Sequence, residues 1–112
     1  MGKVVLLNAF PINMLDFETT SSYMVGLNKM DLMRLKEVVE GKEVRCYIRH
    51  TATVEVLKKV LGIELTPSNE VYRYEEGDDI YVVTLKKPIR GQEVSVSEDD
   101  LIVISVKIVK SW

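Results

Sequence analysis

The sequence predicts an α+β fold, in which helices pack on a single mixed β-sheet of about five strands. Segments with the apolar patterns of strands outnumber the two segments with the three-to-four-residue spacing of amphipathic helices. Their order is irregular, without the repeated strand–helix pairs of a parallel α/β sheet. At 112 residues the chain supports one hydrophobic core, so residues 1–112 are expected to form a single domain.

Residues 3–7 are the first expected strand, because four consecutive apolar side chains suit a strand that is covered on both faces. Residues 8–15 contain too many Asn and Pro interruptions for a regular helix and are expected to form a loop. Residues 19–26 include Thr, Ser, Tyr and Val and predict a second strand.

Residues 29–40 carry the spacing of an amphipathic helix. Asn28 or Asp31 is a suitable N-terminal cap, because either side chain can accept a hydrogen bond from a free backbone N–H group, and Gly41 is a suitable stop. Residues 44–49 then alternate between apolar and more polar side chains, which predicts a half-buried strand.

A second helix is expected over residues 54–61, where apolar residues recur at i, i+3, i+6 and i+7 and Gly62 follows as a stop. The run Arg49-His50-Thr51-Ala52-Thr53 precedes it and holds the only histidine. His50 therefore lies at or just before a helix N-terminus, where free N–H groups and the helix dipole favour an anion. A histidine beside a bound phosphate can pass a proton to a leaving oxygen, but the same residue can also simply flank the helix.

The second half of the chain is dominated by strand patterns. Residues 71–75 and 80–85 are expected to form a hairpin joined by the acidic turn at 76–79. Residues 101–109 alternate as a final strand.

Two loops offer further candidate ligand groups. The polar loop after residue 85 carries Lys86, Lys87 and Arg90, a local positive charge that suits a flap closing over an anion. Most exposed basic clusters, however, are only solvated surface. The loop after the first strand carries Asn8 and Asn13, whose carboxamides can bind adenine or phosphate edges. An Asn at a strand end more often closes an Asx turn.

Composition excludes several classes of protein. The formal charge of −2 and pI near 5.4 argue against binding to long nucleic acid, which needs a strongly basic surface. No apolar run is long enough for a membrane span, and the N-terminus does not have the pattern of a signal peptide. The single Cys46 excludes an intramolecular disulfide and favours a reducing, cytoplasmic location. We expect no metal site, because the chain has one Cys and one His, and the acidic turn lacks calcium-loop spacing.

Three motifs, in order along the chain, resemble those of the viral ring nucleases, the anti-CRISPR proteins of type III systems. The opening run over residues 2–15, GKVVLLNAFPINML, closely resembles the start of that family. The run from Arg49 to Thr53 resembles the family's histidine turn, which leads into a helix. Tyr81-Val82-Val83 and the basic segment from Lys87 to Gly91 resemble the family's Tyr-Val-Val-containing strand, which ends in a basic flap and a Gly. The resemblance covers residues 2 to 94 or so.

The resemblance implies a homodimer that binds cyclic oligoadenylate, in particular cyclic tetra-adenylate, across its two-fold axis. In the family, a ribose 2′-hydroxyl attacks the adjacent phosphorus while the histidine protonates the departing 5′-oxygen, without metal or cofactor. The products are short linear adenylates with a cyclic phosphate end, and their formation switches off antiviral effectors in the cytoplasm of the host cell.

Carried over to this chain, the resemblance makes His50 the general acid and gives Lys87 or Arg90 the role of stabilising charge on the phosphorus. The expected ligand-binding residues are Asn8, Ala9, Phe10, Pro11, Asn13, Thr51, Thr53 and Lys86.

The chain departs from the family pattern at four of these positions. Pro11 stands where the family has a serine, and Thr51 where it has an aspartate. Lys87 aligns with the flap arginine and Arg90 with a frequent glutamate; lysine keeps the charge but loses bidentate phosphate contact. A dimer that sequesters the cyclic nucleotide without cutting it is therefore the first alternative. A small structural or regulatory viral protein with an unrelated partner is the second.

Overall fold

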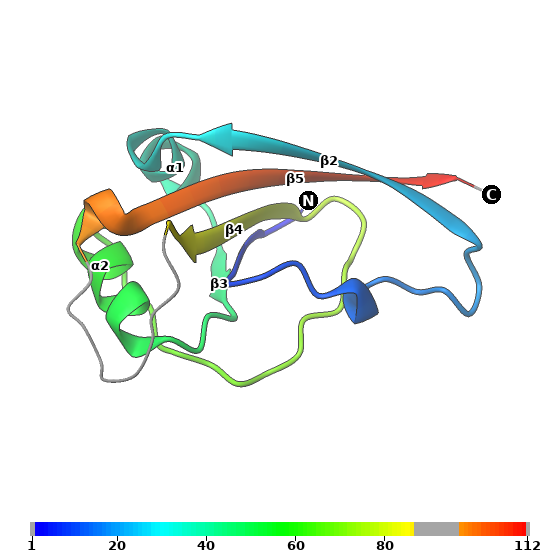
Figure 1. Ribbon diagram of the computed structural model, residues 1–112, viewed down its shortest axis with the longest axis horizontal. Coiled ribbons are helices and arrows are strands. Elements are labelled where there is room, and N and C mark those ends of the chain that lie inside the picture. Colours follow the sequence, from blue (N-terminus) through cyan, green and yellow to red (C-terminus); the bar gives the residue numbers. More distant parts are fainter. Residues whose placement is uncertain (1, 87–96, 112) are drawn as a thin grey trace.

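Five strands form one mixed sheet in the computed structural model, which describes residues 2–86 and 97–111 (Figure 1). They are β1 (Val4–Leu7), β2 (Ser22–Met30), β3 (Val44–Cys46), β4 (Asp79–Leu85) and β5 (Leu101–Ser111). Their order across the sheet is β2-β5-β4-β1-β3. β1 runs parallel to β3 and β4, whereas β5 is antiparallel to β2 and β4. The α+β class with a single mixed sheet is thus confirmed.

The helices α1 (Leu32–Val39) and α2 (Thr51–Leu61) cover one face of the sheet. Their buried side chains meet those that β1, β4 and β5 direct to the same face; the set is Leu35, Val39, Val54, Leu57, Leu61, Val4, Leu6, Val83 and Val103. Burying a side chain of this size stabilises the fold by about 1.5–3 kcal/mol. Within the described residues, no helix is long and apolar enough to cross a membrane.

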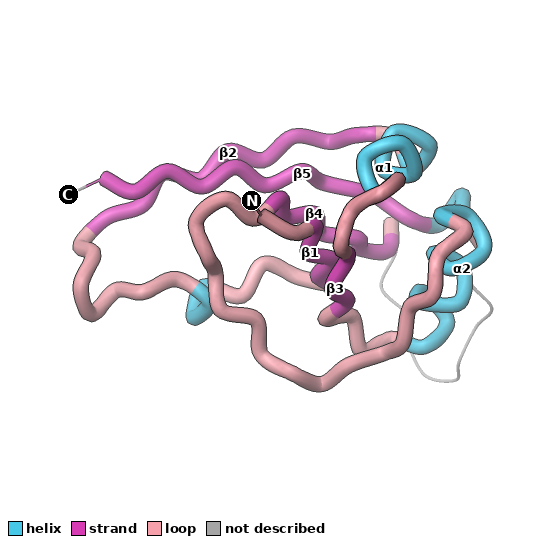
Figure 2. Tube along the Cα trace, turned by 180° about the vertical axis from the view of Figure 1, so that it is seen from behind, coloured by secondary structure: helices cyan, strands magenta, loops and turns pink. Residues whose placement is uncertain are grey.

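Loops rather than helices cover the other face of the sheet (Figure 2). The segment 8–21, which includes the 3₁₀ turn η1 (Ile12–Met14), and the segment 62–78 bury Met14, Leu15 and Tyr72 there. They pack against Val5, Leu7, Ile80 and Val82. β1 therefore has covered faces on both sides, which explains the unbroken apolar run in its sequence.

The expected hairpin over residues 71–85 is wrong. Residues 71–75 form no strand, and β4 pairs with β1 and β5 instead. The alternation there has another cause, because Tyr72 packs into the loop-covered core and the Tyr74 N–H donates to the carbonyl of Met14 (3.0 Å). The segment is a covering loop whose alternate side chains face the core.

Strand β2 is longer and begins later than the expected strand at 19–26. Its nine residues pair with β5, from Ser22 opposite Ser111 to Met30 opposite Val103. This ladder delays the following helix, which begins at Leu32 after Asp31 rather than at residue 29. Long-range pairing thus decided a boundary that the apolar spacing placed three residues too early.

The termini of α2 follow the sequence more closely. The helix begins at Thr51, directly after His50, and ends before Gly62, which adopts the left-handed conformation (φ 68°). The Gly62 N–H donates to the carbonyl of Lys58 (2.9 Å), so the expected glycine stop is confirmed. The preceding strand β3 is shorter than the expected 44–49, since it ends at Cys46.

Candidate functional site

Three segments from distant parts of the sequence meet at one edge of the sheet. β4, β1 and β3 are adjacent and parallel, so their carboxyl ends lie at the same edge. Asn8 follows β1, His50 follows β3 by a short link, and Lys86 follows β4. Neighbouring strands lie about 4.8 Å apart, so the three chains leave the sheet across a span of roughly 10 Å. In open α/β sheets, ligands bind outside this edge.

The amino end of α2 contributes backbone donors to this edge. His50 occupies the N-cap position in an extended conformation (φ −73°, ψ 109°), and its carbonyl accepts the first intrahelical hydrogen bond, from Val54 N–H (3.1 Å). The N–H groups of residues 51–53 precede that bond and so have no acceptor within the helix. With the positive end of the helix dipole, they favour a negatively charged ligand group.

The His50 ring is held by a neighbour on the first turn of the helix. Its Nδ1 lies 2.8 Å from Oγ1 of Thr53, whose residue is only 3% exposed. Thr53 was expected to hold the ligand, but its hydroxyl faces His50, so its backbone N–H is the group it can offer to an anion. Thr51, in contrast, is exposed at the start of the helix. The i, i+3 spacing of His50 and Thr53 is the sequence signal that would have predicted this contact.

The loop after β1 places its candidate residues unevenly. Asn8, directly after the strand, is half-buried, as are Phe10 and Pro11, whereas Ala9 and Asn13 are exposed. Phe10 packs against the loop-covered core. η1, which carries Asn13, lies away from α2 in both views (Figures 1 and 2). The structure therefore brings Asn8, but not Asn13, to the edge where His50 lies.

Lys86 is the residue of the basic loop that the structure describes. The exposed Lys86 donates its backbone N–H to the carbonyl of Asp100 (2.9 Å), at the end of the 3₁₀ turn η2 (Glu98–Asp100). η2 in turn contacts α2. Lys87 and Arg90 lie outside the described residues.

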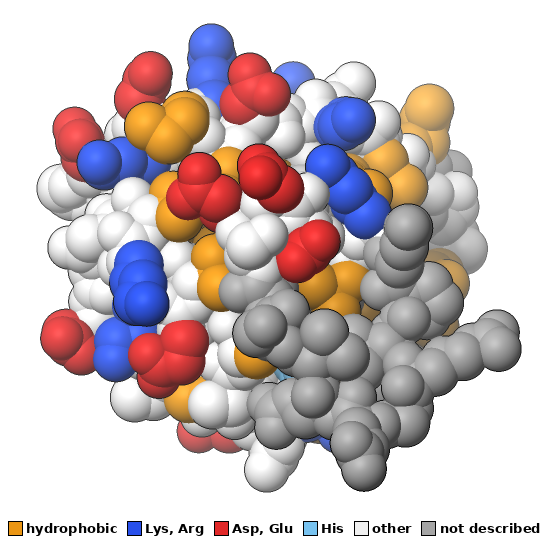
Figure 3. Space-filling model, turned by 60° about the vertical axis from the view of Figure 1, so that its left-hand side comes forward, with side chains coloured by type: hydrophobic (Ala, Val, Ile, Leu, Met, Phe, Trp, Pro, Cys, Tyr) orange, Lys and Arg blue, Asp and Glu red, His pale blue; other side chains and the backbone are white. Residues whose placement is uncertain are grey.

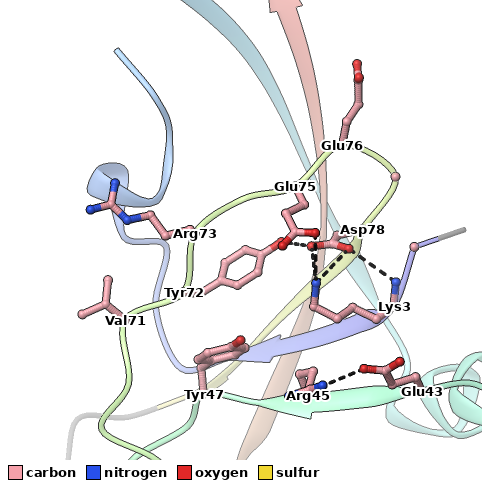
Figure 4. A pocket seen from close by; sticks show the side chains of 12 residues that line it. Lys3, Glu43, Arg45, Tyr47, Val71, Tyr72, Arg73, Glu75, Glu76 and Asp78 are labelled. Atoms are coloured by element: carbon pink, nitrogen blue, oxygen red, sulfur yellow. Dashed lines mark hydrogen bonds and ion pairs between the residues drawn. The ribbon is translucent and has the colours of Figure 1, made fainter. Parts of the chain in front are cut away.

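A cavity of about 580 Å³ lies at the opposite edge, beside the amino ends of β1, β3 and β4 (Figure 4). Lys3 and Asp78, 75 residues apart, form its central ion pair, with Nζ 3.1 Å from Oδ2. The Tyr72 hydroxyl also donates to Asp78, and Arg45 pairs with Glu43 at 2.8 Å. Arg73 and Glu76 point away from the central pair in Figure 4.

The polar side chains at the centre of this cavity bond to one another. Burial alone raises the pKa of the Asp78 carboxyl, but the hydrogen bonds from Tyr72 and Lys3 outweigh it and hold the pKa below its ordinary value. Burial and the bond to this carboxylate raise the pKa of Tyr72. We therefore interpret Lys3, Tyr72 and Asp78 as a structural latch between the first strand and the loop at 62–78, and we call it the Lys3–Asp78 latch below.

Metal chemistry finds no support in the described part of the chain, where no group of three or more His, Cys, Asp and Glu side chains is placed to hold an ion. Cys46 is half-buried, and burial raises the pKa of its thiol, which disfavours the reactive thiolate. Acidic and basic side chains are interspersed over the face shown in Figure 3.

Comparison with known proteins places the chain in a family. Residues 4–108 match the STIV B116-like family. The chain belongs to this family. Among solved structures, B116 of Sulfolobus turreted icosahedral virus (STIV) is similar, with 24% sequence identity, a TM-score of 0.67, and coverage of 94% of this chain and 98% of B116. No curated protein matches the chain. At this identity, the likeness to B116 shows a shared fold, and activity must be argued from the site.

Proposed function

We propose that this member of the STIV B116-like family is a metal-independent ring nuclease. Its expected substrate is cyclic tetra-adenylate, and its expected products are linear diadenylates with 2′,3′-cyclic phosphate ends. The single observation that carries the proposal is the position of His50, at the amino end of α2 and at the sheet edge shared with Asn8 and Lys86. The likeness of residues 2–15, 49–53 and 81–91 to the viral ring nucleases supports the same reading.

The proposed reaction uses the groups gathered at this edge. A phosphate of the cyclic nucleotide binds the N–H groups of residues 51–53. The neighbouring ribose 2′-oxygen then attacks the phosphorus of that phosphate. The bond from phosphorus to the 5′-oxygen breaks, His50 gives its Nε2 proton to that oxygen, and solvent takes the 2′-hydroxyl proton. General-acid help of this kind is worth about 10²–10⁴-fold, and holding the ring in line for attack supplies much of the remainder. Lys87 or Arg90 is expected to stabilise the charge on the phosphate.

A homodimer is part of the proposal, because a symmetric ring with two cuts suits two symmetry-related histidines. β2 is an edge strand of nine residues, and it exposes Met24 (66%) and Leu27 (58%). A long apolar edge is the kind of surface that a second copy covers. A second copy would also supply another Asn13, which lies away from His50 within one protomer.

One observation favours sequestration without cleavage as a second candidate. Pro11 precedes η1 at the position where the ring nucleases have a serine, and its carbonyl accepts the Met14 N–H (3.1 Å). Proline lacks both a hydroxyl and a backbone N–H, so this loop has fewer donors for a ligand. Weaker positioning of the cyclic nucleotide would reduce its binding less than its cleavage.

The test compares the native protein with two His50 variants, in EDTA, with cyclic tetra-adenylate. His50→Ala removes the ring and weakens the cap, whereas His50→Asn removes the ring and keeps a good N-cap residue. The expected result is linear diadenylate from the native chain, formed about 10²–10⁴-fold more slowly by either variant. Tight binding with intact ligand from all three proteins would identify a sequestering protein. Absence of binding by calorimetry would refute both functions and favour an unrelated partner.

A further inference from the structure

Thr53 carries its hydroxyl at a buried position, which is unusual for a polar side chain. It is the third residue of α2 and, like Thr20, one of the polar residues that are buried in the described part of the chain. Burying a hydroxyl is unfavourable unless it is hydrogen-bonded. The Thr53 hydroxyl lies within hydrogen-bond distance of Nδ1 of His50, at 2.8 Å.

We propose that Thr53 is the positioning residue for His50, which fixes the ring so that Nε2 is the nitrogen presented to the ligand. The consequence for catalysis rests on the proposed function, whereas the fixed ring rests on the contact alone. A β-branched side chain in a helix has few rotamers, so the hydroxyl is a rigid partner. His50 itself lies outside the helix, and its ring needs such a partner to keep one orientation.

A hydroxyl suits this role because it can both donate and accept. In the neutral tautomer that carries its proton on Nε2, the Thr53 hydroxyl donates to Nδ1. When the ring is charged, Nδ1–H donates to the Thr53 oxygen, and Nε2 again carries a proton. After Nε2 gives its proton to the leaving 5′-oxygen, Nδ1–H still donates to Thr53. The contact therefore persists through the proton transfer.

Three substitutions separate positioning from a merely structural role. Thr53→Val keeps the branched shape and removes the hydroxyl, Thr53→Ser keeps the hydroxyl, and Thr53→Ala removes it with a better helix-forming residue. Thr20→Val is the matched control, since it removes a hydroxyl from another buried threonine, in the loop before β2. Thermal unfolding of each variant reports any general loss of stability.

The first readout needs no ligand. His50 is the only histidine, so the two ¹⁵N resonances of its ring can be assigned without ambiguity in the full-length protein. We expect the Nδ1 resonance to move in Thr53→Val and Thr53→Ala, and to stay near its native position in Thr53→Ser and Thr20→Val. If Nδ1 keeps its native shift in a folded Thr53→Val or Thr53→Ala protein, the proposal is overturned.

The second readout is the cleavage of cyclic tetra-adenylate. An imidazole ring that is free to turn is misplaced for proton transfer. Thr53→Val should therefore lower kcat by up to about 100-fold with little change in KM, and Thr53→Ser should keep kcat close to its native value. If Thr53→Val instead raises KM by a similar factor and leaves kcat unchanged, the positioning role of Thr53 is contradicted. If the native protein does not cleave cyclic tetra-adenylate, the proposed function fails. The resonance of Nδ1 still decides whether Thr53 holds His50.

Discussion

The Lys3–Asp78 latch offers a stability prediction that can be worked from the structure. The Asp78 side chain is 3% exposed and accepts hydrogen bonds from Tyr72 and from Lys3, whose Nζ and backbone N–H both donate to it. Asp78→Asn removes the charge and leaves the Lys3 ammonium without its closest partner. Breaking a buried pair from one side costs about 3–5 kcal/mol.

Two features of the structure reduce this figure. The Lys3 side chain is 19% exposed and keeps some contact with water, and the Glu75 carboxylate lies 3.7 Å from Nζ. We therefore expect Asp78→Asn to lower the free energy of unfolding by about 2–3 kcal/mol. For a chain of this size, that corresponds to a fall in Tm of roughly 8–12 °C.

Urea unfolding at pH 7 measures this loss, with Glu75→Gln as the matched control. Glu75 pairs with the same lysine but is 73% exposed, so its substitution should change stability by about 0–1 kcal/mol. A double-mutant cycle of Lys3→Met with Asp78→Asn should give a coupling energy of about 1–2 kcal/mol. Additive effects, or a loss in Asp78→Asn no larger than in Glu75→Gln, would refute the latch.

The latch also predicts how stability depends on pH. The folded-state pKa of Asp78 lies below its unfolded value, so its contribution is complete above the unfolded pKa, near 3.8, and declines as pH falls through the lower folded pKa. For Lys3, burial lowers the pKa, but the bond to Asp78 raises it above its usual value of 10.5. Its contribution is therefore lost as pH rises through that higher value. Asp78→Asn should remove the acid-side loss.

Three further predictions concern catalysis, packing and assembly. His50→Asn should lower the single-turnover rate with cyclic tetra-adenylate by about 10²–10⁴-fold, and an unchanged rate would exclude His50 as the general acid. Gly2→Ala should lower the free energy of unfolding by about 1–3 kcal/mol in urea, because its Cβ would lie 1.7 Å from the Gly77 carbonyl oxygen. Gly26→Ala, with its nearest neighbour at 3.8 Å, is the control, and equal losses would contradict the clash. We expect the native chain to sediment as a dimer and Leu27→Lys as a monomer, and a dimer that persists in Leu27→Lys would place the proposed interface elsewhere.

The local residue pattern of the chain predicted several elements correctly. The apolar run of β1 indicated a strand covered on both faces, and the helical spacing with Gly62 indicated the end of α2. These features depend on neighbours in the sequence, such as side-chain periodicity and a residue that adopts a positive φ. His50 was placed at a helix start for the same reason, because strand alternation stops just before it and helical spacing begins soon after.

Long-range contacts decided what the pattern placed wrongly. The alternating residues 71–75 predicted a strand, but Tyr72 and Tyr74 serve a covering loop that bonds to η1. β2 extends to Met30 because β5, about 80 residues further along the chain, supplies a partner for each of its residues. The Lys3–Asp78 pair joins residues 75 apart, a contact that periodicity does not reveal.

By itself, the sequence determined the α+β class, the helix start at His50, and the candidate groups Asn8, His50 and Lys86. Only the tertiary structure decided that these groups share one edge, because that depends on β4, β1 and β3 being adjacent and parallel. It also turned the Thr53 hydroxyl toward His50 and placed η1, the turn that carries Asn13, away from α2. Local residue patterns specify which elements form, whereas strand order and packing, set by contacts between distant residues, specify which side chains meet.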